Sequence, residues 1–139
     1  IGKTLNEIHL LNVKNLKLMC NDAIEVVTHS LVDQSLDRVL IFFPDPWPKK
    51  RHNKRRLIQT DFMTLIARKL KPNGRLHLAT DWKPYAAHMM HVLEALSEFS
   101  NAIAPHHFWG QPDRPETKFE KRGKNLGHGV WDLLYKKND

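Results

Sequence analysis

The chain has 139 residues, which is enough for one domain with a modest hydrophobic core. It carries 22 Lys or Arg against 15 Asp or Glu, and the resulting net charge of +7 is typical of proteins that bind nucleic acid. A single cysteine excludes a disulfide framework and a cysteine zinc site, and no apolar stretch is long enough to span a membrane. Because Ile1 opens no signal-peptide pattern, we expect a cytoplasmic protein without a membrane partner.

Two patterns alternate along the chain and predict its elements. Helical periodicity predicts helices at residues 1–11, 23–31, 54–70, 84–99 and 117–124. Short apolar runs predict strands at residues 16–20, 37–43, 75–79, 101–106 and 129–136. The second of these runs is almost continuously apolar, which is typical of a strand covered on both faces. Cys20 ends the first run, and we expect its thiol in the core.

This alternation predicts an α/β fold with a mostly parallel sheet, in a single domain that spans residues 1–139. Ligands of such sheets bind beyond the carboxyl ends of the strands. Three successive predicted strands end at an acid, namely Asp22, Asp45 and Asp81. Any one of these acids also fits a simple helix cap. Three acids at the same edge favour a binding site.

Residues 42–56, FFPDPWPKKRHNKRR, form the most informative stretch of the chain. Asp45 stands between two prolines, which fix the backbone and direct its carboxylate either at a ligand or into a turn. A carboxylate can accept hydrogen bonds from a base edge or offset a developing positive charge. Trp47 can stack on a base or cover the loop. A run of cations also suits a solvated loop, but beside Asp45 we expect these residues to bind phosphates: Lys49, Arg51, Lys54, Arg55 and Arg56.

The remaining polar patterns are weaker. Asp22 follows a predicted strand and opens a helix, so it suits either a hydrogen bond to the amino group of a nucleotide-like cofactor or a helix cap. His88 and His91 are three residues apart on a predicted helix but lack a third ligand, so we expect no metal site. The chain contains neither GxGxxG nor a P-loop.

Four segments resemble the bacterial tRNA (guanine-N7-)-methyltransferases: 42–56, LATDW (78–82), RPETKFEKRG (114–123) and LGHGVWDLLY (126–135). MCNDAIEV (19–26) fits the same family, so the resemblance runs through essentially the whole chain. It implies a Rossmann-like class I fold that depends on S-adenosylmethionine. It also implies the reaction, transfer of a methyl group to N7 of a guanine in the variable loop of tRNA.

The resemblance further implies roles for individual residues. Asp22 is expected near the adenine of the cofactor, and Asp45 is expected to be the catalytic acid, which also contacts the cofactor. The substrate-binding residues implied are Lys49, Asp81, Thr117, Lys118, Phe119 and Glu120. The RNA-binding residues implied are Arg51, His52, Asn53, Lys54, Arg55 and Arg56. Pro48 stands where the family often has a histidine, and this difference changes little.

One departure from the family concerns the N-terminal part of the family's domain. The family's glycine-rich cofactor loop, its ribose-binding acid and the first two strands of its sheet lie before the segment that corresponds to Ile1. The resemblance therefore covers the C-terminal two-thirds of the family and predicts a partial methyltransferase domain with those strands absent. We expect this chain alone to bind S-adenosylmethionine weakly, to lack useful activity and to self-associate through open sheet edges.

Three functions remain compatible with the sequence. The first is the tRNA guanine-N7 methyltransferase, of which this chain resembles a fragment. The second is a methyltransferase of the same fold that acts on another base or on an amine, because an acid between prolines beside an aromatic also suits amino-group methylation. The third is a non-catalytic RNA-binding module, whose affinity for tRNA would depend on salt but not on a cofactor.

Overall fold

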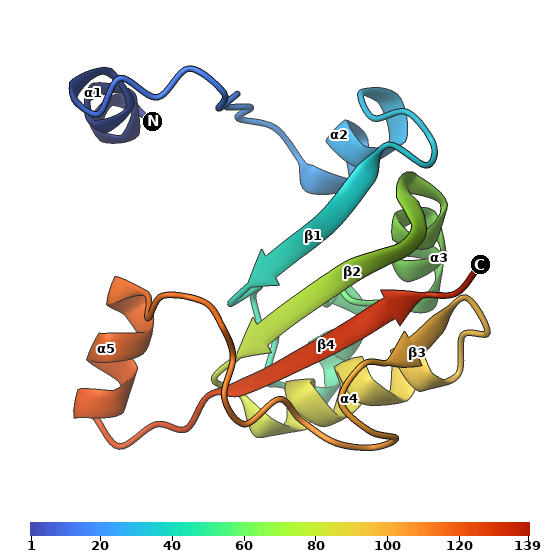
Figure 1. The fold of residues 1–139 in the computed structure, drawn as a ribbon. Coiled ribbons are helices and arrows are strands. Elements are labelled where there is room, and N and C mark those ends of the chain that lie inside the picture. Colours follow the sequence, from blue (N-terminus) through green and yellow to red (C-terminus); the bar gives the residue numbers. More distant parts are fainter. The chain divides into compact units, whose positions relative to one another are not determined.

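A computed structural model describes all 139 residues, and their contacts divide the chain into two units, Ile1–Ser30 and Leu31–Asp139. The first unit holds two helices, and the second holds the sheet and the remaining helices (Figure 1). None of the helices combines the length and apolarity that crossing a bilayer requires.

The first unit contains α1 (Gly2–Leu10) and α2 (Ala23–His29), and both helices were predicted from periodicity. Asp22 is the N-cap of α2, because its Oδ1 accepts hydrogen bonds from the backbone N–H groups of Ile24 at 2.8 Å and Glu25 at 3.3 Å. The cap therefore uses one carboxylate oxygen and satisfies two of the free N–H groups at the start of the helix.

The strand predicted at residues 16–20 does not form, and Cys20, which was predicted in the core, is exposed. Leu16 and Met19 are also exposed, at 50% and 60% of their surface. A strand is stable only when a neighbour pairs with its backbone and its apolar side chains are covered. Neither condition holds for this segment, so its apolar composition alone does not produce a strand.

The second unit is built on a four-stranded sheet in the order β1-β2-β4-β3. Its strands are β1 (Leu36–Phe42), β2 (Leu70–Thr80), β3 (Phe99–Asn101) and β4 (Trp131–Lys137). The α/β class is confirmed, but the prediction of a mostly parallel sheet is wrong for this chain. Only β1 and β2 are parallel, whereas β4 is antiparallel to β2 and β3. The long connection after β3 brings the chain back to the carboxyl end of β2, where Trp131 pairs with Thr80, so β4 runs the opposite way.

Helices α3 (Thr60–Lys69) and α4 (Lys83–Glu94) pack against one face of the sheet (Figure 1). The core lies between these layers and is fully or almost fully buried. Its main apolar residues are Leu76, Leu78, Leu133 and Tyr135 from the strands and Phe62, Ile66, Met89 and Leu93 from the helices. Helix α3 begins six residues later than predicted, because residues Lys50–Arg55 form a separate 3-10 helix, η1.

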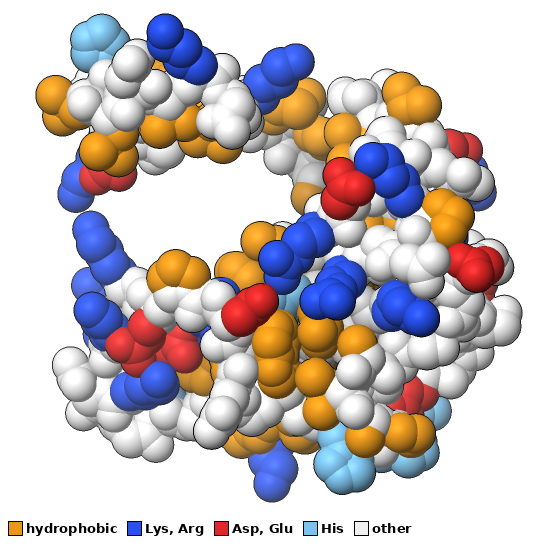
Figure 2. Space-filling model, viewed as in Figure 1, with side chains coloured by type: hydrophobic (Ala, Val, Ile, Leu, Met, Phe, Trp, Pro, Cys, Tyr) orange, Lys and Arg blue, Asp and Glu red, His pale blue; other side chains and the backbone are white.

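Strand β1 lies at the edge of the sheet and is only partly buried, so the prediction that both of its faces are covered is wrong. Leu40, in its centre, is 53% exposed. The face opposite α3 and α4 also carries a row of cations, because Arg38, Arg75 and Lys136 occupy matching register positions on neighbouring strands. Figure 2 shows basic side chains gathered over this face. Adjacent like charges weaken strand pairing, so this row does not stabilise the sheet.

Candidate active site

The loop after β1 presents Asp45 at the carboxyl end of that strand. Its Oδ1 accepts a hydrogen bond from the backbone N–H of Trp47 at 3.2 Å, and the residue is otherwise exposed. The backbone on both sides is held in the left-handed region, with φ of 53° at Phe43 and 42° at Trp47. Such conformations cost about 1–3 kcal/mol each for bulky residues and persist where the surrounding structure imposes them. The loop therefore places strained backbone on both sides of an accessible carboxylate.

Buried contacts at two residues, Arg56 and Ile58, fix the end of the basic segment that follows Asp45. Arg56 is only 5% exposed, donates from Nε to the carbonyl of Pro46 at 2.8 Å, and places its guanidinium 4.9 Å from the centre of the Tyr85 ring. The Tyr85 hydroxyl accepts from the N–H of Ile58 at 3.1 Å, and His88 Nε2 lies 2.8 Å from the carbonyl of the same residue. Side chains of α4 thus hold the C-terminal end of the basic segment.

The exposed basic side chains lie on and around η1. Arg55 lies over the ring of Trp47, with its guanidinium carbon 5.1 Å from the ring centre, and His52 meets the same ring edge-on at 5.8 Å. Trp47 therefore packs within its own loop. The sequence allows two roles for Trp47, stacking on a base or covering the loop, and these contacts match the second. The cations that remain exposed are Lys49, Lys50, Arg51, Lys54 and Arg55, whereas Arg56 serves as an anchor.

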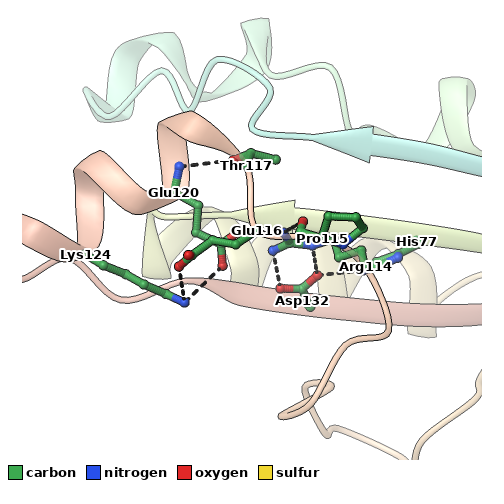
Figure 3. Close-up of polar contacts among 8 residues, drawn as sticks. All are labelled: His77, Arg114, Pro115, Glu116, Thr117, Glu120, Lys124 and Asp132. Carbon is green, nitrogen blue, oxygen red and sulfur yellow. Dashed lines mark hydrogen bonds and ion pairs between the residues drawn. The ribbon is translucent and has the colours of Figure 1, made fainter. Parts of the chain in front are cut away.

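A second polar centre joins the segment before α5 (Lys118–Asn125) to the sheet (Figure 3). Arg114 donates to Asp132 from Nε at 2.7 Å and from Nη2 at 2.8 Å, and it donates to Glu120 from Nη1 at 2.5 Å. Asp132 also lies 2.6 Å from Nε2 of His77, which belongs to β2. These four side chains are at most 7% exposed. We call them the buried polar network.

Charge within the buried polar network is balanced by direct contact. Burial by itself would raise the pKa of Asp132, but hydrogen bonds from His77 and Arg114 outweigh burial and hold that pKa below its ordinary value. Burial likewise opposes ionisation of Glu120, and its hydrogen bond from Arg114 lowers the pKa overall. The hydrogen bond to Asp132 is the main cause of the raised pKa of Arg114. Both carboxylates and the guanidinium are therefore charged at neutral pH.

Aromatic contacts bring the two sequence motifs together. The Phe43 ring, two residues before Asp45, lies 4.9 Å from the ring of Phe119 in α5. The guanidinium of Arg114 lies 5.2 Å from the ring of Phe42 and 5.8 Å from that of Phe43. Segments 42–56 and 114–123 are far apart in sequence, so the fold unites them at the carboxyl end of β1.

A pocket of 590 Å³ opens beside the buried polar network. Its walls combine the aromatic rings of Trp109 and Trp131 with the charged groups of Glu116, Glu120 and Lys124. Lys124 pairs with Glu116 at 2.7 Å and with Glu120 at 3.5 Å. This mixture of flat apolar walls and hydrogen-bonding groups suits a planar polar ligand such as a base.

The other predicted site residues lie at separate positions. Thr117 caps α5, and its Oγ1 accepts from the N–H of Glu120 at 3.0 Å, while Lys118 is exposed on the same helix. Asp81 follows the last residue of β2 and lies 3.9 Å from Nδ1 of His128, which lines the pocket. Asn53 has a buried Oδ1 without a hydrogen-bond partner. Asp22 belongs to the first unit.

Sequence reasoning missed three residues of the buried polar network: His77, Arg114 and Asp132. A signal was present for two of them, because His77 and Asp132 interrupt runs of apolar residues in two of the predicted strands. A polar residue at such a position needs a buried partner. No group of three or more His, Cys, Asp or Glu side chains is arranged so that it could hold a metal ion.

The sequence was compared with known families and proteins. A family model described as "Putative methyltransferase" matches residues 1–133. The tRNA (guanine-N(7)-)-methyltransferase of Alcanivorax borkumensis is 51% identical over 138 residues, which are 99% of this chain and 58% of that protein. The protein of the same name from Serratia proteamaculans is 49% identical over 140 residues and is covered to 59%. The chain thus spans somewhat less than two thirds of the length of these relatives.

Solved structures identify the fold. An rRNA methylase from Streptococcus thermophilus matches with a TM-score of 0.61 at 13% identity, over 99% of this chain and 67% of that one. A SAM-dependent O-methyltransferase from Thermotoga maritima matches with a TM-score of 0.54 at 13% identity, over 99% of this chain and 44% of that one. The expected methyltransferase fold is confirmed, as part of the full fold. The chain belongs to the methyltransferase family of the matching model, and it is homologous to part of the tRNA (guanine-N(7)-)-methyltransferases.

Proposed function

We propose that this chain is the substrate-binding part of an enzyme that transfers a methyl group from S-adenosylmethionine to N7 of a guanine in the variable loop of tRNA. The observation that carries the proposal is that Asp45 lies directly before a basic segment that is anchored to the fold. The exposed carboxylate stands at the carboxyl end of β1, and the cations of η1 begin five residues later. Relatives that are about half identical in sequence carry the name of this activity.

The carboxylates of this chain fit parts of the cofactor. S-adenosylmethionine supplies a reactive methyl group on a positively charged sulfur and carries an adenine amino group that donates hydrogen bonds. Asp22 uses only Oδ1 in capping α2, so its Oδ2 can accept from an amino group. Asp45 uses only one oxygen, in its turn. The glycine-rich loop that the resemblance implies for the family is not among these residues, so we expect weak binding by this chain alone.

The proposed chemistry requires alignment more than proton transfer. Guanine N7 has a free lone pair at neutral pH, so no general base is needed to make it a nucleophile. The protein must hold N7 in line with the methyl donor. It must also place negative charge near the ring, which becomes cationic when the methyl group is transferred. Asp45 would do both by accepting from the N1–H and amino groups of the guanine.

The polar groups around the pocket would complete the recognition of the guanine. Glu120 lines the pocket, Thr117 fixes its backbone, and Asp81 lies beside the same wall through His128. Lys49, Lys118 and Phe119 are exposed around Asp45 and on α5, where they would contact the nucleotide. We propose that each of these residues binds substrate.

The exposed cations of η1 would position the RNA. Arg51, Lys54 and Arg55 are exposed, and the segment is anchored through Arg56, so its charges are presented from a fixed backbone. Phosphate contacts supply affinity without reading sequence, and each one adds to the salt dependence of binding. His52 and Asn53 lie within the same segment and would contact the RNA beside them.

The test is the identity of the product. This chain alone, and this chain joined to the part of the Alcanivorax borkumensis relative that lies outside the matched region, are incubated with S-adenosylmethionine and unmodified tRNA. The tRNA is then digested to nucleosides and analysed by mass spectrometry. We expect N7-methylguanosine from the joined protein and little or none from this chain alone.

The same experiment separates the alternatives. A different methylated nucleoside would assign this chain to a methyltransferase that acts on another base. No methylated nucleoside, together with tRNA binding that depends on salt and not on cofactor, would leave a non-catalytic RNA-binding module. Either result would overturn the proposed function.

A further inference from the structure

The proposed function gives a role to Glu120 but none to the side chains that hold it. We propose that Asp132 and His77 are positioning residues, which act through Arg114 to fix the carboxylate of Glu120 at the wall of the pocket (Figure 3). The role of Glu120 in substrate binding rests on the proposed function. Its fixed orientation rests on the contacts within this chain.

The geometry of Arg114 leaves it little freedom. Asp132 accepts from both Nε and Nη2, at 2.7 Å and 2.8 Å, so it sets the plane of the guanidinium. Once that plane is set, the direction of Nη1 is set as well, and Nη1 meets Oε2 of Glu120 at 2.5 Å. The rings of Phe42 and Phe43 pack against the guanidinium and limit its movement further.

His77 fixes the carboxylate on which this arrangement depends. Its Nε2 lies 2.6 Å from Oδ2 of Asp132, and its side chain is 1% exposed. The ring is held between Phe42, at 4.9 Å between centres, and Trp109, at 5.0 Å. Strands β2 and β4 therefore determine where Asp132 points, and Asp132 determines where Arg114 points.

Stability alone does not account for this arrangement. Removing charges from water is costly, and a buried ion pair is often no more stabilising than apolar residues of similar volume. Asp132 and His77 lie on neighbouring core strands where apolar residues would pack without that cost. What the ion pairs provide is a fixed geometry. Arg114, Glu120 and Asp132 all line the pocket, and of these only Glu120 lies on a helix, so its position depends on the contacts that hold that helix to the sheet.

The sign of a pKa change distinguishes positioning from a simple charge effect. The side-chain carboxyl of Glu120 is titrated by carbon-13 NMR in this chain and in Asp132→Asn. If Asp132 were only a nearby negative charge, its removal would lower the pKa of Glu120. If Asp132 holds Arg114 against Glu120, its removal frees the guanidinium and the pKa of Glu120 rises toward its ordinary value. We expect the rise, and an unchanged or lower pKa would overturn the proposal.

Two variants of His77 and one control variant extend this titration. His77→Leu removes the contact to Asp132 and should raise the pKa of Glu120 in the same direction, which keeps the test valid if Asp132→Asn does not fold. His77→Gln retains an N–H group that can donate to Asp132 and should restore the parent value. Asp113→Asn is the matched control, because Asp113 is exposed, precedes Arg114 and pairs only with Arg38 at 3.8 Å. It should leave the titration of Glu120 unchanged.

Kinetics test the consequence for methylation. In the protein that methylates tRNA, Asp132→Asn should lower kcat about 100-fold, the size expected for a misplaced reacting group, while KM for tRNA changes less than about threefold. A rise of about 100-fold in KM for tRNA with kcat unchanged would contradict a positioning role. If the parent protein does not methylate tRNA, the proposed function fails, whereas the titration of Glu120 still decides whether Asp132 positions it.

Discussion

Among the basic residues of segment 42–56, Arg56 differs from its neighbours in what it contacts. Its side chain is buried against Tyr85 and bonded to the carbonyl of Pro46, whereas Arg51 is exposed. The sequence assigns both residues to RNA because a run of cations contains no information about which side chain turns inward. Burial is determined by α4, which lies about thirty residues further along the chain.

Replacing Arg56 therefore tests anchoring. Arg56→Ala should lower the free energy of unfolding by about 1–3 kcal/mol, because it leaves the partly buried carbonyl of Pro46 without its donor and removes the contact with the Tyr85 ring. Urea unfolding followed by circular dichroism measures the change. Arg51→Ala is the control and should stay within about 0.5 kcal/mol of the parent. Equal stability of the two variants would show that Arg56 is not an anchor.

His88 gives the second prediction at this scale. Burial lowers its pKa, so the unfolded chain binds a proton more readily than the folded one. The contribution of His88 to the free energy of unfolding is therefore fully present above its ordinary pKa of about 6.5. It is lost as the pH falls below that value and through the lower pKa that His88 has in the folded chain. His88→Gln should reduce the dependence of stability on pH between about 7 and 5, and an unchanged dependence would contradict this role of His88. Urea midpoints measured across that range decide between these outcomes.

At the scale of elements, the sequence identified the helices and most strands because their apolar periodicity is strong. Helices α1 and α2 and strands β1 and β4 form close to the predicted ranges, whereas α4 ends five residues earlier than predicted and only Asn101 of the strand predicted at residues 101–106 lies in β3. Several predictions failed, and the physical reason is clear for two of them. Residues 16–20 have strand composition but no partner, and the direction of β4 follows from a long connection whose path no local pattern describes.

Strand β1 carries a prediction that follows from its place in the sheet. Its outer edge pairs with no other strand, and Leu40 in its centre is 53% exposed. Unpaired edges promote association between chains, so we expect this chain to self-associate in sedimentation equilibrium experiments. Leu40→Lys should weaken association because charge on an edge strand opposes pairing. Leu126→Lys, at a leucine that is 71% exposed elsewhere, should not. A monomer at every concentration would contradict this prediction.

At the scale of the whole molecule, the fold brings together segments that lie far apart in the sequence. Segments 42–56 and 114–123, which both carry the family resemblance, meet at the carboxyl end of β1, where Phe43 contacts Phe119. The buried polar network behind them was not predicted, because its ion pairs connect β2, β4 and the segment before α5. A single sequence reveals unusual residues in buried strands, but their partners emerge only from the fold.

The most direct test of the account is the single-turnover rate at which N7-methylguanosine forms in tRNA, measured for Asp45→Asn and for the parent in the joined protein. The change keeps the size of the side chain and removes the negative charge. We predict a rate at least about 100-fold lower with tRNA affinity unchanged, because Asp45 would act on the developing charge and the cations would hold the RNA. A rate within about threefold of the parent would contradict the central role of Asp45.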